Sequence, residues 1–147
     1  MTHHETLTHV RQALLDLHKA LIERERAIYE RGHGPVTAGE MLQLLIRDEQ
    51  FSWLHPISEL IVRVDELISN ASDRRRPTPT RPPMTPDQVR AEAAVLLAET
   101  RTLLTSGDAP GGFRERYEAA LQRDQSIVLM HRAVISALPP DADRVTH

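Results

Sequence analysis

Apolar side chains recur at alternating spacings of three and four residues along the segment 6–31. An α-helix turns once in ~3.6 residues, so this spacing puts them on one side of a helix and predicts a buried apolar face. The residues of this stripe are Leu7, Val10, Leu14, Leu17, Leu21 and Ile28. Arg24 or Glu25 interrupts it. Such a long helix needs other elements to cover its stripe, so the rest of the chain decides the fold.

Helical periodicity continues in the later segments, and no useful run alternates as a strand would. The predicted helices cover 6–31, 37–46, 56–68, 86–104 and 113–138, and Asp124 is a plausible N-cap that splits or kinks the last. In the helix 37–46 the residues Met41, Leu42, Leu44, Leu45 and Ile46 are apolar almost all round, so we expect this short helix to be deeply buried. The sequence predicts an all-α fold with four principal helices and one short buried helix, packed as an irregular up-down bundle.

Capping residues mark several of these helix ends. Gly34 and Pro35 follow the first helix and indicate a left-handed C-cap, after which proline cannot continue the helix. The pair Thr37 and Glu40 has the spacing of a capping box, in which each side chain bonds to the other residue's backbone amide. The sequence Thr85-Pro86-Asp87-Gln88 repeats this pattern with proline at the first helical position.

The segment 72–85 separates two helical halves, 6–70 and 86–138. It is rich in arginine and proline and is expected to be an extended linker, and residues 139–147 are expected to form a loose tail. Each half alone is about 70 residues, which is marginal for a core, so we expect both to pack as one domain over 1–147. The alternative is two small domains joined by the linker.

The chain has 147 residues and no cysteine, which excludes disulfides and thiolate chemistry. Its start lacks the pattern of a signal peptide, and no apolar run approaches the ~20 residues of a membrane span. We therefore expect a cytoplasmic protein that does not enter a membrane. Lys19 is the one lysine among 18 basic residues, an arginine bias that we interpret as a GC-rich, bacterial coding sequence.

Four side chains are the candidates for a metal site: His18, His55, Glu59 and His131. His55 and Glu59 lie one turn apart if both are helical, and helical bundles do hold transition metals with histidines and carboxylates from several helices. Against this, His55 precedes Pro56, which disfavours helical geometry. Separately, Glu59 and Arg63 are spaced to pair at i,i+4 on the outer face of the helix. The alternative is that these histidines are half-exposed and hydrogen-bonded.

Two other features have both a structural and a functional interpretation. The basic segment Arg74-Arg75-Arg76 with Arg81 could bind an acidic partner, RNA or anionic lipid, or could only keep the linker extended. It has no aromatic residue for base stacking, and both flanking halves are net acidic, which argues against nucleic-acid binding. Phe51, Trp53 and Leu54 form the one aromatic cluster along the chain, either as core or as an interface anchor.

No phosphate-binding loop, dinucleotide-binding motif or nucleophile signature is present, so we predict no cofactor and no catalytic residue. The wide apolar stripes instead favour a non-enzymatic interaction module that binds itself as a homodimer or binds another protein. The alternative function is a metal- or small-ligand-binding bundle, with an oxidoreductase as one case. It would use His18, His55, Glu59 and His131 with a transition metal ion.

Overall fold

The computed structural model describes residues 3–71, 84–106 and 112–140. Within these residues every regular element is helical and no strand is present, which confirms the all-α prediction. The helices are α1 (His3–His33), α2 (Ala38–Arg47), α3 (Glu49–Ser52), α4 (His55–Ala71), α5 (Pro86–Thr105), α6 (Phe113–Arg123) and α7 (Gln125–Ala137). No helix in these ranges is long and apolar enough to cross a membrane.

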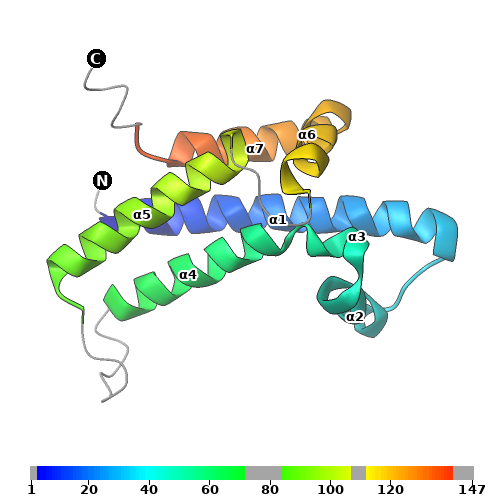
Figure 1. Ribbon diagram of the computed structural model, residues 1–147, viewed down its shortest axis with the longest axis horizontal. Coiled ribbons are helices and arrows are strands. Elements are labelled where there is room, and N and C mark those ends of the chain that lie inside the picture. The colour runs from blue at the N-terminus through cyan, green and yellow to red at the C-terminus, as the bar shows by residue number, and fades with distance from the viewer. Residues whose placement is uncertain (1–2, 72–83, 107–111, 141–147) are drawn as a thin grey trace.

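The long helix α1 is the axis of the molecule, and α4, α5 and α7 pack along it (Figure 1). Helix α4 also packs on α5, and α6 packs on α7. The helices before and after the segment 72–83 therefore pack against each other. That segment, which holds the four arginines of the predicted linker 72–85, lies outside the described residues, as do 141–147 of the predicted tail.

One hydrophobic cluster fills the space between these helices. Its α1 members are Leu7, Val10, Leu14, Leu17 and Leu21, as the predicted stripe requires. Trp53 and Leu54 belong to the same cluster, and the ring of Phe51 is also fully buried. The interpretation of this aromatic group as core is confirmed, and it is not an exposed interface anchor.

The predicted stripe of α1 is wrong at its end. Ile28 is 38% exposed, whereas Glu25, one turn after Leu21, is only 5% exposed. The reason is that α4 and α7 do not extend along the last turns of α1, where the short helix α3 packs instead (Figure 1). A polar contact with α3, described below, explains why a carboxylate is accepted at this buried position.

Local capping determines the helix ends largely as predicted. Gly34 follows α1 with φ of 80°, a left-handed conformation that suits glycine, and its amide donates to the Glu30 carbonyl at 2.9 Å. Thr85 and Gln88 form both bonds of a capping box at the start of α5. Asp124 ends α6 and begins α7, and its carboxylate accepts from the Ser126 amide at 3.0 Å.

Two ion pairs join neighbouring helices on their outer sides. Arg63 of α4 pairs with Glu99 of α5 through both carboxylate oxygens, one of them 3.2 Å from Nη2. Arg11 of α1 pairs with Asp65 of α4. The predicted partner of Arg63 was Glu59, but the hydrogen-bonded partner is Glu99, because packing α4 on α5 brings that carboxylate closer to the guanidinium.

Candidate functional site

Helix α2 lies at the edge of the molecule, beside α3 and away from the α4–α5 pair (Figure 1). Its main packing partner is α3, a single turn that links it to α4. A ten-residue helix is too short to be stable by itself in water, so α2 depends on contacts that fix it to α1 and α3. Those contacts determine which of its faces is left uncovered.

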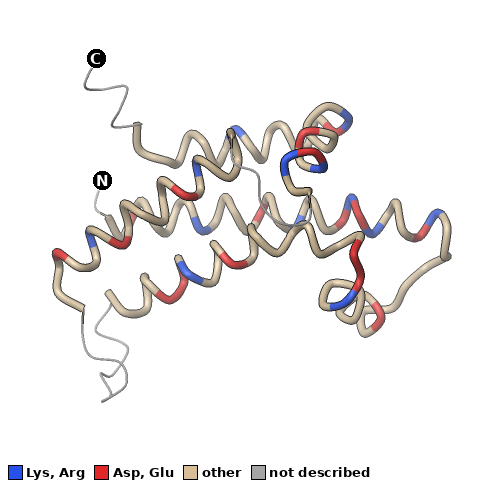
Figure 2. Tube along the Cα trace, viewed as in Figure 1, with Lys and Arg blue, Asp and Glu red and all other residues tan. Residues whose placement is uncertain are grey.

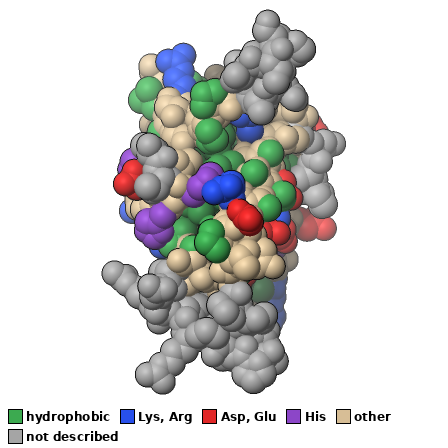
Figure 3. Space-filling view, turned by 90° about the vertical axis from the view of Figure 1, so that its left-hand side faces the viewer, with side chains coloured by type: hydrophobic (Ala, Val, Ile, Leu, Met, Phe, Trp, Pro, Cys, Tyr) green, Lys and Arg blue, Asp and Glu red, His purple; other side chains and the backbone are tan. Residues whose placement is uncertain are grey.

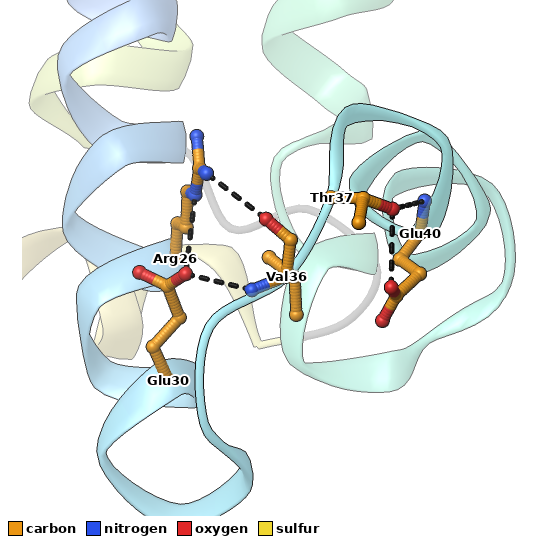
Figure 4. A network of polar contacts seen from close by, with 5 residues as sticks. All are labelled: Arg26, Glu30, Val36, Thr37 and Glu40. Carbon is orange, nitrogen blue, oxygen red and sulfur yellow. Dashed lines mark hydrogen bonds and ion pairs between the residues drawn. The ribbon is translucent and has the colours of Figure 1, made fainter.

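The connection between α1 and α2 is held by a small polar network (Figure 4). The carboxylate of Glu30 accepts from the amide of Val36 at 2.9 Å, and Arg26 donates to the Val36 carbonyl at 3.1 Å. The hydroxyl of Thr37 then accepts from the Glu40 amide at 3.2 Å and caps α2. The carboxylate of Glu40 accepts from the same hydroxyl and not from the Thr37 amide, so only half of the predicted capping box forms.

A second set of contacts fixes α3 against α1. The side-chain Nε2 of Gln50 donates to the buried carboxylate of Glu25 at 3.1 Å and to the backbone carbonyl of Glu25 at 3.2 Å. The rings of Phe51 and Tyr29 pack with centroids 6.1 Å apart. The Nε2 atom of His55, the first residue of α4, forms a hydrogen bond with the backbone carbonyl of Leu45 in α2 at 3.1 Å. Both ends of the α2–α3 unit are therefore anchored.

The outer side of α2 is exposed, so the prediction of a deeply buried helix is wrong. Met41 is its one buried residue, while Leu42 is 56% and Ile46 is 58% exposed. The physical reason is that α2 packs at the end of the bundle against one short helix, so no helix in the described residues covers its other side. Gly39, Leu42 and Ile46 lie along this side at spacings of three and four residues, and we call them the α2 face.

Large exposed apolar residues elsewhere are isolated on their helices. Val62 lies on α4, Val95 on α5 and Leu129 on α7, and single exposed residues of this kind are ordinary. Figure 3 shows the end of the molecule opposite α2, where apolar side chains alternate with charged and histidine side chains over the described part of the surface. The pair on α2 is different because both side chains occupy one face, a turn apart.

The four predicted metal ligands are distributed over three helices. His18 lies on α1, His55 and Glu59 on α4, and His131 on α7. His18 and His55 are close enough for the charge on His55 to lower the pKa of His18. Within the described residues, no three histidine, aspartate or glutamate side chains gather as a metal site would require. Metal binding therefore stays a prediction, which the proximity of His18 and His55 supports.

His131 has a partner that the sequence did not reveal. Its Nδ1 lies 2.7 Å from the hydroxyl of Tyr117, which is fully buried on α6. Burial raises the pKa of Tyr117 well above its ordinary value, so the phenol stays protonated. Phe113 stacks on Tyr117 at 5.2 Å and packs against Trp53 at 5.6 Å. These rings join α6 and α7 to the junction between α3 and α4, which is a structural role.

Arg114 connects this aromatic cluster to α5. Its guanidinium lies 5.8 Å from the centre of the Tyr117 ring and donates to the carbonyls of Leu103 and Leu104 at 3.3 and 3.1 Å. It thereby satisfies carbonyl groups in the last turn of α5. A shallow cavity of about 450 Å³ runs beside it, lined by residues 112–122 of α6 and its N-cap. Because one helix supplies its whole lining, the cavity brings together no groups from separate elements.

Comparison with models of known families, with characterised proteins and with solved structures finds no match for this chain. The function has to be inferred from the side chains and their placement.

Two half-buried histidines predict how stability depends on pH. The pKa of His18 is lowered below 6.5 mainly by burial and to a smaller extent by the charge on His55. The pKa of His131 is likewise lowered mainly by burial and to a smaller extent by the charge on Arg114. As the pH falls, these histidines take up protons in the unfolded chain at a higher pH than in the folded chain. The free energy of unfolding therefore decreases as the pH falls from about 6.5 toward the lower pKa values of the folded state. We expect at most about 1.4 kcal/mol per pH unit for each histidine.

Urea titrations at pH 7 and at pH 5.5 would measure this loss. The double variant His18→Gln with His131→Gln should show a flatter pH dependence over the same interval. An unchanged slope in that variant would contradict the assignment to these two residues.

Charge on the described helices is mixed and not sorted by sign. Lysine and arginine residues are interspersed with aspartate and glutamate residues along the described helices (Figure 2). The basic segment of the predicted linker, Arg74 to Arg76 with Arg81, lies outside the described residues. The described helices therefore carry no long run of basic residues that would favour binding to the phosphates of a nucleic acid.

Proposed function

We propose that this protein is a non-enzymatic interaction module that binds a protein partner on the α2 face. The observation that carries the proposal is the exposure of Leu42 and Ile46, one turn apart on a helix whose opposite side is anchored. Burying two half-exposed aliphatic side chains contributes roughly 1–2 kcal/mol each, which favours a helix or groove that covers them.

The anchoring of α2 also supports this proposal. The Glu30–Val36 and Gln50–Glu25 hydrogen bonds hold the helix in place before any partner binds. A preorganised surface loses less conformational entropy on binding than a helix that has to fold first. The α2 face therefore combines apolar area with rigidity, as a docking helix needs.

Site-specific photocrosslinking in cells that express this chain would test the proposal. A photoreactive amino acid in place of Leu42 or Ile46 should give discrete protein adducts. The same substitution at Val62 or Leu129, which are 54% and 58% exposed, provides a matched control and should give none. If positions 42 and 46 give no adduct, or the same adducts as the controls, the proposal is wrong.

A further inference from the structure

We infer that the α2 face binds a second copy of this chain, with the two α2 helices antiparallel across a two-fold axis. This inference rests on the proposed function and names its partner. It follows from the order of the charged and polar residues along α2, which becomes self-complementary when the helix is paired with its own reversed copy. A two-fold dimer requires this property, because the same patch has to meet itself.

The charges of α2 are placed at opposite ends. Glu40 is in its first turn and Arg47 in its last, both exposed. They are seven residues apart, which is close to two full turns, so they lie on the same flank of the helix. When two antiparallel helices are related by a two-fold axis, each flank of one helix lies beside the same flank of the other copy. Each Glu40 then lies beside the Arg47 of the second copy, which forms two equivalent ion pairs.

These two groups are available for such pairs. Arg47 forms no ion pair with any residue that the structure describes. Glu40 uses one carboxylate oxygen, Oε1, to accept from Thr37 and keeps Oε2 for another donor. Gln43 is exposed midway between them. A side-chain amide both donates and accepts, so the two copies of Gln43 can bond to each other near the axis.

The apolar part of the face fits the same arrangement. Ile46 lies near the seam between the two helices, and Leu42 lies on the flank opposite Glu40 and Arg47, where it can pack against its own copy. Gly39 lies in line with them, and a Cβ built on it would meet no atom within 4 Å, so a second helix can approach closely there. Specific interfaces bury about 800 Å² on each partner, and a single ten-residue helix supplies less. The dimer is therefore weak and depends on concentration.

Charge reversal tests the pairing. Sedimentation equilibrium of the full, untagged chain, up to about 1 mM because small interfaces bind weakly, should show a monomer–dimer equilibrium. Glu40→Arg alone and Arg47→Glu alone each replace two attractive contacts by two repulsive ones. Each should weaken self-association about tenfold at low salt. An equimolar mixture of the two variants should restore it, because every contact is attractive again.

The chain carrying both Glu40→Arg and Arg47→Glu is the matched control, since its charges are reversed but again complementary. It should associate like the original chain, and circular dichroism should show equal helix content in all four proteins. If the mixture and the double variant do not recover association, the antiparallel pairing is wrong.

The remaining outcomes separate this inference from the proposed function. If Leu42→Ser with Ile46→Ser abolishes the dimer while charge reversal has no effect, the antiparallel pairing is overturned and the α2 face remains the docking surface. If the chain is monomeric throughout, a second copy is not the partner. The proposed function then stands only if positions 42 and 46 crosslink to a different protein.

Discussion

Replacing Phe113 by alanine is expected to lower the free energy of unfolding by about 3–5 kcal/mol, the range for removing a buried phenylalanine ring. Phe113 is fully buried as the first residue of α6. Its ring lies between Trp53 and Tyr117, with centroids 5.6 and 5.2 Å away. Alanine would leave a cavity between Trp53 and Tyr117, and the cavity adds to the lost burial of the ring. Urea denaturation followed by circular dichroism measures the loss.

Phe113→Leu is the matched control, because leucine keeps most of the apolar volume. It should reduce stability by roughly 1–2 kcal/mol, since the cavity is smaller. An alanine variant as stable as the leucine variant would mean that the ring does not hold α6 against Trp53.

The helix boundaries were predictable from the sequence because they depend on local chemistry. A glycine with positive φ ends α1 at Gly34, and hydroxyl or carboxylate caps begin α5 at Thr85 and α7 at Asp124. Each of these signals acts within four residues of the helix end. The apolar spacing in α1 likewise identified its buried face from Leu7 to Leu21.

The burial of α2 was not predictable in the same way. Its apolar residues Met41, Leu42, Leu44, Leu45 and Ile46 spread over much of its circumference, and this pattern alone indicates a deeply buried helix. Whether Leu42 and Ile46 are covered depends on how many helices surround α2, and among the described helices its main packing partner is the single turn α3. The same cause reverses the roles of Glu25 and Ile28, since the helices that cover the stripe of α1 do not extend to its end.

Partners of polar side chains were the least predictable part. Arg63 was expected to pair with Glu59 on its own helix and instead pairs with Glu99, which is 36 residues away. His131 bonds through Nδ1 to the hydroxyl of Tyr117 across the break at Asp124, and no sequence pattern indicated this partner. These contacts depend on the relative rotation of two helices, which a single sequence does not specify.

The contrast between Leu17 and Leu42 distinguishes the core from the docking surface. Leu17 is fully buried on α1, whereas Leu42 is 56% exposed on α2. Leu17→Ala should lower the free energy of unfolding by about 2–5 kcal/mol, because it removes buried methyl groups and leaves a cavity. Leu42→Ala should change it by no more than about 0.5 kcal/mol, as surface substitutions usually do.

Comparing both variants with the original chain by thermal and urea denaturation, at a concentration where the chain is monomeric, makes this test independent of any partner. A loss above about 1 kcal/mol in Leu42→Ala would exceed the range of surface substitutions and place the residue in the core, which would contradict the proposed function. A stable Leu42→Ala variant that no longer crosslinks from position 46 would locate the effect in binding. A side chain that contributes little to folding but much to association is what a docking surface requires.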